Sequence, residues 1–220
     1  MTHYAYIRDR IEPFRDDLKP RVAQLSYQVA CRQVALETLA LREFVEFTIP
    51  AGTISQPIYD PTYEREAIYI FRAKISGHRH DLPLYNQDAL EDLYHNITPF
   101  EGTIAAYTTD QGQFWPNRPP ASDTQVIADV AYKPIGDFDE VGFGPEFEDA
   151  IVHGALAHYL ALPGSGQDKS EARRLETQFI TECSSLRGAN LVGDAGYKRA
   201  STAPRRHYFG QGFHSNMLRY

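Results

Sequence analysis

The chain has 220 residues, 42% of them hydrophobic, and this length and composition suit one domain with a buried core. Its formal net charge is −7, and it contains 2 cysteines. Cys31 and Cys183 both fall in expected helices beside apolar residues, which argues against a disulfide framework. No stretch approaches the ~20 apolar residues that cross a bilayer, and the N-terminus lacks a signal-peptide pattern, so a soluble cytosolic protein is expected.

Two helical segments are expected in residues 1–42, as the N-terminal part of a helical bundle. The first runs from residue 4 to about residue 18 and is interrupted by Pro13. The second starts at Pro20, a residue suited to a first helical turn, and continues to about Arg42. At a period of 3.6 residues, its buried side is predicted to contain Val22, Leu25, Val29, Leu36 and Ala40, and this side is widened by Tyr27, Ala30, Val34 and Leu41. Its polar stripe is predicted to contain Gln24, Gln28, Arg32 and Arg42.

Residues 43–135 change to short runs rich in β-branched and aromatic residues, separated by turn residues. These runs predict strands over 43–49, 53–58, 66–75, 102–108 and 125–132. A short helix capped by Asn86 is expected over 86–95. The pattern predicts a small antiparallel β module inserted between helices. Its loop containing Phe114 and Trp115 is either covered core or exposed interface, and core is favoured for Trp115.

Residues 145–186 predict a pair of antiparallel helices. The first covers 145–162, because it starts with proline and a run of acids and stops at Pro163-Gly164. Four small residues along it form a stripe that lets another helix approach closely: Ala150, Gly154, Ala157 and Ala161. The second helix has Asp168 at its cap and Glu171 three residues later, and it is expected to end at Leu186. Its predicted apolar side contains Ala172, Leu175, Phe179, Cys183 and Leu186.

Residues 187–220 are predicted to form an extended C-terminal arm with its own charge. The single acid in this segment is Asp194, and the six basic residues are Arg187, Lys198, Arg199, Arg205, Arg206 and Arg219. Six positive charges against one negative charge give +5, so the total of −7 leaves −12 for residues 1–186. Aromatic and apolar residues are interleaved with these charges, whereas a solvated tail is normally poor in aromatics. An arm that binds a partner is therefore expected, and a loose terminus without a role is the alternative.

Histidines and acids offer little evidence of a metal site. His78 and His80 lie two residues apart in a turn, but no further ligands complete a cluster. His153 and His158 are five residues apart on an expected helix, too far round it to share a metal ion. The sequence predicts packing roles for these two histidines and no metal centre.

The acidic run Asp137, Asp139 and Glu140 resembles a fragment of a calcium loop. It lacks the glycine at the sixth position and the terminal glutamate of the full pattern, so a solvated loop is expected. The chain has no glycine-rich nucleotide-binding motif and no recognisable nucleophile motif. Neither a cofactor nor an enzymatic activity is predicted.

The order of these segments resembles a family of virion proteins. The resemblance covers most of residues 20–186 and is strongest where a strand ending in Lys133-Pro134 is followed by an acidic loop and then by the helix of residues 145–162. In that helix, Glu148, Ile151 and Gly154-Ala-Leu precede the terminal Pro163-Gly164. This pattern resembles the head-to-tail adaptor proteins of tailed bacteriophages, especially those similar to tail tubular protein A of short-tailed phages.

The resemblance implies a homo-oligomeric ring, generally twelvefold, between the portal protein and the tail nozzle or tail tube protein. Such a protein is assembled in the host cytoplasm, resides in the neck of the virion, lets genomic DNA pass without specific binding, and needs no membrane. An acidic body suits this role, because a positive channel wall would hold phosphates. The implied portal-binding arm contains Tyr197, Lys198, Arg199, Arg205, Arg206, Tyr208, Phe209, Phe213, Met217, Leu218 and Tyr220.

The expected fold class is α+β: an antiparallel helical bundle with an inserted small antiparallel β module and an extended C-terminal arm. Three alternatives to the adaptor function remain open. One is a different tail-assembly protein of the virion. Another is a nucleic-acid-binding module in which Tyr208-Phe209 beside Arg205-Arg206 stack on single strands, although the acidic body opposes phosphates. The last is a hydrolase using the acids of residues 137–140, for which no positioned base or nucleophile is apparent.

Overall fold

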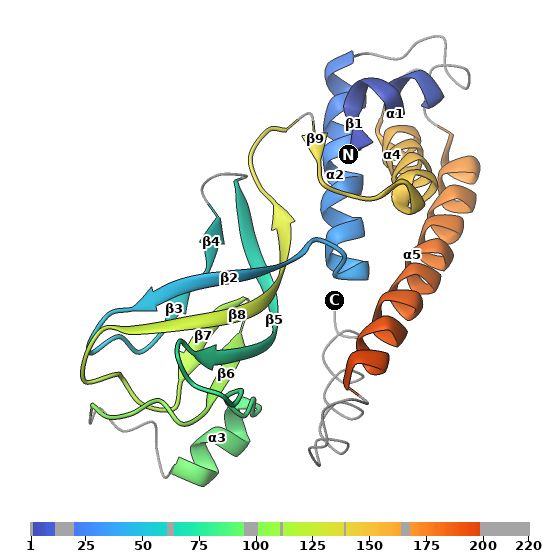
Figure 1. Cartoon of the computed structure of the whole chain (residues 1–220). Helices are drawn as coiled ribbons and strands as arrows, with labels where there is room; N and C mark the ends of the chain where they lie inside the picture. The colour runs from blue at the N-terminus through green and yellow to red at the C-terminus, as the bar shows by residue number, and fades with distance from the viewer. Residues whose placement is uncertain are drawn as a thin grey trace.

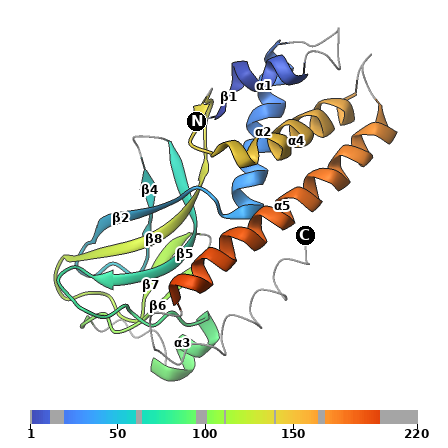
Figure 2. The same ribbon diagram turned by 45° about the vertical axis from the view of Figure 1, so that its right-hand side comes forward.

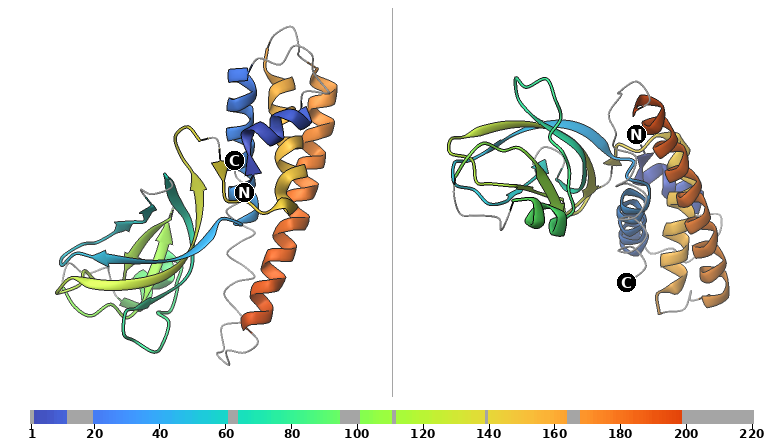
Figure 3. Two further views of the ribbon diagram at one scale, coloured as in Figure 1. Left: turned by 45° about the horizontal axis from the view of Figure 1, so that its top comes forward. Right: turned by 90° about the horizontal axis from the view of Figure 1, so that it is seen from below.

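The computed structural model of the chain describes residues 2–11, 20–60, 64–94, 101–110, 112–138, 140–163 and 168–198. They form a mixed α+β structure with antiparallel sheets, as the sequence predicts. The helices formed by the two ends of the described chain gather on one side, and the sheets lie on the other side (Figure 1). The view from below separates these two parts clearly (Figure 3).

The helical part is assembled from segments far apart in the sequence: α1 (Tyr4–Ile11), α2 (Pro20–Thr38), α4 (Glu148–Ala161) and α5 (Lys169–Lys198). Helix α4 contacts α1, α2 and α5, and it lies between α2 and α5 (Figure 1). The predicted first turn of α4 is a 3-10 helix, η2 (Pro145–Phe147). Strands β1 (Thr2–His3) and β9 (Glu140–Val141) pair and fasten the N-terminal end to the segment before η2.

Helix α2 buries only part of the side predicted: Tyr27, Ala30 and Val34 are buried as expected, but its two exposed leucines were misplaced. Leu25 and Leu36 were expected in the core, but they are 47% and 42% exposed. Gln28, expected in the polar stripe, is buried, and its Nε2 donates to the carbonyl of Phe138 at 3.0 Å. The prediction was wrong because the core side of α2 is built from smaller residues and Tyr27: Ala23, Ser26, Tyr27, Ala30, Cys31, Val34 and Ala35.

Helix α2 also ends four residues before the predicted Arg42. The Oγ1 of Thr38 donates to the carbonyl of Val34 at 2.6 Å, and Leu39 adopts a left-handed conformation with φ 54°. A left-handed residue directly after a helix stops its hydrogen-bond pattern. By Leu41 the chain is already paired with the sheet, since its carbonyl accepts from the backbone N–H of Tyr132 at 2.8 Å.

The larger antiparallel sheet has the strand order β2-β8-β5-β4: Arg42–Ile49, Thr124–Pro134, Arg65–Ile75 and Tyr59–Asp60. The smaller sheet has the order β3-β7-β6: Gln56–Pro57, Gln113–Pro116 and Tyr107–Asp110. Three predicted strands, over 43–49, 66–75 and 125–132, match β2, β5 and β8 within two residues. The predicted short helix is α3 (Gln87–Tyr94), and Asn86 Oδ1 caps it by accepting from the N–H of Ala89 at 2.7 Å.

Two predicted strands are much shorter than expected. Of residues 53–58 only Gln56 and Pro57 are in β3, and of residues 102–108 only the last two belong to β6. Strand β7 was expected as a loop, because its four residues end in a proline. It forms a strand because Phe114 is fully buried and stacks on Tyr107, with ring centroids 4.8 Å apart. Trp115, for which core was favoured, is half-buried.

The β core lies between the two sheets. Along β8 the side chains of Val126, Ala128, Val130 and Tyr132 share one face and belong to the core, and Asp129 and Ala131 on the other face are buried as well. Gly112 admits close approach of β5, since a Cβ there would lie 1.8 Å from the carbonyl oxygen of Ala67. Its φ of +75° is also a conformation that glycine adopts without strain.

Helix α5 is twelve residues longer than predicted, and this changes the expected arm. The end was expected at Leu186, but no proline follows before Pro204, and the helix continues to Lys198. It projects well past the end of α4 (Figure 2). The expected arm residues Tyr197 and Lys198 are thus helical and not extended. The remaining expected arm residues lie outside the described residues: Arg199, Arg205, Arg206, Tyr208, Phe209, Phe213, Met217, Leu218 and Tyr220.

Candidate interaction site

The close packing of three helices around α4 depends on its small residues. Ala150 and Gly154 are buried, and a Cβ at Gly154 would lie 2.9 Å from the Phe179 ring and 3.2 Å from the Cβ of Ala30. Gly154 therefore lets α2 and α5 approach the same point of α4 from two directions. Ala157 is buried as well, whereas Ala161 is exposed. The predicted small-residue stripe thus runs from the helix core to the surface.

A groove of about 490 Å³ lies between α2 and α5 along one side of α4, and we call it the helical groove. Its floor is formed by Gly154, Ala157 and Ala161 of α4. Its walls contain Gln33 of α2, His158 of α4, and five residues of α5: Lys169, Ala172, Arg173, Glu176 and Phe179. Its basic residues lie towards the start of α5, and Phe179 lies further along. The groove combines an apolar floor with charged walls.

His158 has its side chain at the junction of α2 and α4. Its Nδ1 lies 3.0 Å from the Oγ of Ser26, which is buried on α2. Burial lowers the pKa of His158 below its usual 6.5. The neutral imidazole is therefore the favoured form in the folded protein, and it links α2 to α4 as a hydrogen-bond partner.

Three large apolar side chains of the helical part are exposed. Leu25 and Leu36 lie on α2 and are 47% and 42% exposed, and Ile180 on α5 is 55% exposed. Ile180 lies one turn after Glu176, so the two residues share a side of α5. The described part of the chain leaves these apolar side chains open to solvent.

The Cys183 thiol of α5 lies close to two carboxylates. Burial first, and then the charges of Glu37 and Glu182, together raise the pKa of this thiol to about 12. Glu37 of α2 is therefore close to α5 at the level of Cys183. In the groove itself, Glu176 lies one turn after Arg173, so acidic and basic side chains are neighbours along α5.

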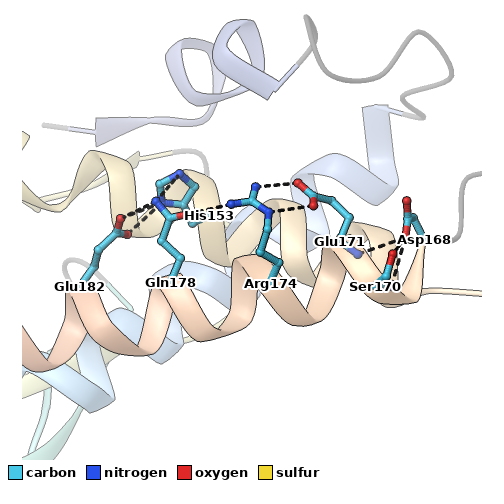
Figure 4. Close-up of polar contacts among 7 residues, drawn as sticks. All are labelled: His153, Asp168, Ser170, Glu171, Arg174, Gln178 and Glu182. Carbon is cyan, nitrogen blue, oxygen red and sulfur yellow. Dashed lines mark hydrogen bonds and ion pairs between the residues drawn. The ribbon is translucent and has the colours of Figure 1, made fainter.

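A row of polar side chains follows another side of α5 (Figure 4): Asp168, Ser170, Glu171, Arg174, Gln178 and Glu182. Glu182 connects this row to α4, because its Oε2 lies 2.9 Å from His153 Nδ1. The Nε2 of Gln178 donates to the Oε1 of Glu182 at 3.1 Å. These contacts between half-buried side chains connect α4 to α5. The role of His153 is therefore packing and pairing with Glu182.

The start of α5 is fixed by a side-chain cap. The Oδ1 of Asp168 accepts from the N–H groups of Ser170 and Glu171, both at 3.1 Å. Glu171 was expected to complete a capping box, but its carboxylate pairs with Arg174 at 2.6 Å. Arg174 holds the pKa of Glu171 below its usual value. The predicted Asp168 cap is confirmed. The predicted return contact from Glu171, which would complete a capping box, is wrong.

A second polar cluster lies on the larger sheet. Asp129 is 1% exposed, and its carboxylate accepts from Arg42 Nε at 2.6 Å and from Arg72 Nε at 3.2 Å. The two guanidinium groups also lie over aromatic rings, Arg42 over Phe71 at 3.9 Å and Arg72 over Phe44 at 5.0 Å. The cluster joins the three longest strands of the sheet through one carboxylate. Its side chains satisfy one another, which favours a structural role.

The residues considered for metal or acid–base chemistry are dispersed. His78 and His80 lie in an exposed turn, His153 pairs with Glu182, and Asp137 is exposed in the segment before β9. Asp139 lies outside the described residues. In the parts of the chain that the structure describes, no three histidine, cysteine or acidic side chains are grouped to hold a metal ion.

Helices in the described ranges are also too short or too polar to cross a membrane. No protein-family model matches the sequence, and a comparison with curated proteins finds no match. The site must therefore be interpreted from its geometry and charge.

Sequence reasoning missed the walls of the helical groove and the Arg42–Asp129–Arg72 cluster. The groove walls gave no signal, because Gln33, Arg173 and Glu176 follow the ordinary polar pattern of surface helices. Asp129 did carry a signal. An acid between Ala128 and Val130, inside a run that is otherwise apolar from Val126 to Tyr132, requires a charged partner when buried.

Proposed function

We propose that this protein is a head-to-tail adaptor: a structural, non-catalytic virion protein that forms a ring between the portal and the tail nozzle or tube of a bacteriophage. The observation that carries the proposal is the packing of α2 against α4 and α5, with the β strands of residues 42–134 as an insertion between them. This organisation supports a helical bundle with an inserted β module. The basic C-terminal arm then begins beyond Lys198 and extends the long helix α5.

Charge supports a role beside a DNA channel. Residues 136–149 contain six acids and no lysine or arginine. Asp137, Glu146 and Asp149 in this segment are exposed. An acidic wall repels phosphates and lets DNA slide, whereas a basic wall would add a salt-dependent affinity. This supports passage of the genome without specific binding, in the neck of a virion assembled in the host cytoplasm.

Exposed apolar residues support ring formation. Leu25, Leu36 and Ile180 lie on the helical part, and Phe44, Ile54 and Tyr59 lie on the β part. A ring requires a head-to-tail contact between two different surfaces of the same chain. Apolar residues on both parts offer such surfaces, and neighbouring subunits would cover them.

Binding to the portal ring encoded beside this protein tests the role of the arm. We expect the full chain to be retained by immobilised portal, and a chain ending at Lys198 to lose most of this retention. Arg205→Ala with Arg206→Ala should weaken retention as well. The matched control replaces the exposed Arg79 and Arg118 of the β part by alanine and should bind normally. Equal retention of the full and shortened chains would contradict the proposed arm.

The basic, aromatic arm also favours a second candidate function, binding of single-stranded nucleic acid. In that case, the full chain would bind an oligonucleotide with an affinity that falls steeply as salt rises, and it would ignore the portal. A different tail-assembly role would give neither result. The two assays together separate these functions from the adaptor.

A further inference from the structure

One side of α5 carries charged side chains that have no partner in the described part of the chain. Lys169, Arg173 and Glu176 are exposed and line the helical groove. Within the described residues, their side chains form no ion pair and no hydrogen bond. The polar row on another side of α5 differs, since its charges pair internally, as Glu171 does with Arg174 (Figure 4). The groove side of α5 is therefore open to charges from another chain.

An exposed apolar residue lies on the same side of α5. Lys169, Arg173, Glu176 and Ile180 occupy positions i, i+4, i+7 and i+11, which share one face of a helix. The spacing of four, three and four residues is that of the contact seam between two packed helices. Ile180 is 55% exposed, and α5 lies at an outer edge of the helical part, where a second helix can approach (Figure 1). This face therefore has the pattern of a helix–helix contact that the described chain does not make.

The order of these four residues is complementary to itself when reversed. Two α5 helices that run antiparallel, with Arg173 of one opposite Glu176 of the other, also place the second Arg173 opposite the first Glu176. The same register sets Lys169 opposite Ile180 at both ends of the contact, and the aliphatic stem of Lys169 can cover the exposed Ile180. Two copies of the chain thus fit each other through one surface, related by a twofold axis.

Charge also selects this register against its neighbours. Shifting one antiparallel helix by seven residues keeps the same face in contact. A shift in one direction places Lys169 opposite Arg173 of the second copy, and a shift in the other direction places it opposite Arg187. A parallel pair in register would place each charge opposite itself. Each alternative opposes like charges, which destabilises a contact.

We propose that two copies of the free protein pair through this face of α5, with the two helices antiparallel. Arg173 of each copy pairs with Glu176 of the other, and Lys169 of each copy covers Ile180 of the other. The contact from residue 169 to residue 180 spans about 17 Å of helix, so we expect the weak, reversible affinity of a small interface. The pairing goes beyond the proposed function and does not rest on it, because it concerns the protein before any portal is bound.

Sedimentation equilibrium of the full-length protein without portal tests the pairing. We expect monomers to become dimers between about 1 and 100 μM, and no larger species, because a twofold contact closes on itself. A protein that stays monomeric over this range, or that forms larger species without dimers, would overturn the proposal. The portal is absent, so failure of the pairing leaves the test of the adaptor role unaffected.

Two charge reversals make the test specific. Arg173→Glu and Glu176→Arg each bring like charges together across the contact, and each variant alone should dimerise roughly tenfold more weakly. An equal mixture of the two variants should recover dimerisation, because every opposed pair then has opposite charges. The matched control reverses two exposed charges of the β part, Glu46 and Arg79, and should dimerise as the wild type does. Unchanged dimers of the single variants, or no recovery in the mixture, would contradict pairing through this face.

Discussion

Gly154 determines how closely the helices pack at the base of the groove. Replacing it with alanine adds a Cβ within 3.0 Å of the buried Phe179 ring. We expect Gly154→Ala to lower the free energy of unfolding by about 1–3 kcal/mol, as overpacking does, although alanine is the better helix former. Urea denaturation measures this difference.

Gly188 provides the matched control, because it lies in α5 and a Cβ there would contact nothing within 4 Å. Gly188→Ala should raise the free energy of unfolding by up to about 1 kcal/mol. If both alanine variants were stabilised equally, the close approach at Gly154 would be wrong.

His158 makes stability depend on pH in a defined direction. Its pKa is lowered by burial from the 6.5 of the unfolded chain, so below that pH the unfolded state binds the proton first. The free energy of unfolding should therefore fall as pH decreases from 6.5 towards the folded pKa, and change no further below it. His158→Gln removes this contribution, so wild type should lose more stability than the variant between about pH 7 and pH 5.

Chemical denaturation at several pH values measures the effect, and the exposed His78→Gln is the matched control. Parallel pH profiles for wild type and His158→Gln would show that burial of the imidazole does not affect its titration.

At the scale of single residues, the sequence predicts caps better than burial. Asn86 and Asp168 were predicted as caps and accept backbone hydrogen bonds as expected, because capping depends on neighbours within three residues. Gln28 was predicted on the surface and is buried. Its environment is set by the carbonyl of Phe138, 110 residues away in sequence. A local pattern does not contain such a contact.

At the scale of elements, the cap of α5 is expected to contribute measurably to stability. Asp168→Ala removes the acceptor for two N–H groups at the helix start and should cost about 1 kcal/mol. Asp168→Asn keeps an acceptor and should cost much less. Thermal unfolding followed by circular dichroism measures both, and equal losses for alanine and asparagine would contradict a capping role.

The positions of long elements follow from sequence more closely than their orientation. Strands β2, β5 and β8 were expected within two residues of their observed bounds, because alternation and turn residues act locally. The rotation of α2 was wrong because its large side chains, Leu25 and Leu36, face outward. Small residues of α2 face α4 instead, where Gly154 brings the helices together. The spacing of apolar residues predicts where a helix lies in the sequence. It does not predict which side of that helix the neighbouring elements cover.

The end of α5 shows a related limit. The helix was expected to end at Leu186, but it continues to Lys198 through Gly188, Gly193 and Gly196. A glycine inside a helix costs roughly 1 kcal/mol relative to alanine, which is too little to end a helix in the absence of proline. Residues 187–198, expected in the extended arm, are therefore part of α5.

At the scale of the whole molecule, charge and topology support the same account. Residues 1–186 carry −12 and residues 187–220 carry +5, and the helices of both chain ends pack around α4. The α+β class with antiparallel sheets was predictable, because each element has a local signature. The groove was not, since it arises only where α2, α4 and α5 meet.

The most direct test of the adaptor account is the mass of the complex formed by the full-length protein and the portal ring of the same phage. We predict a defined complex in which one copy of this protein is added per portal subunit, measured by native mass spectrometry or sedimentation. If neighbouring copies cover the exposed apolar side chains as proposed, bound copies should form a closed set and not a random distribution. Portal and protein that migrate separately when both are present at about 10 μM would contradict the account, because a Kd above this concentration is weak for a specific interface.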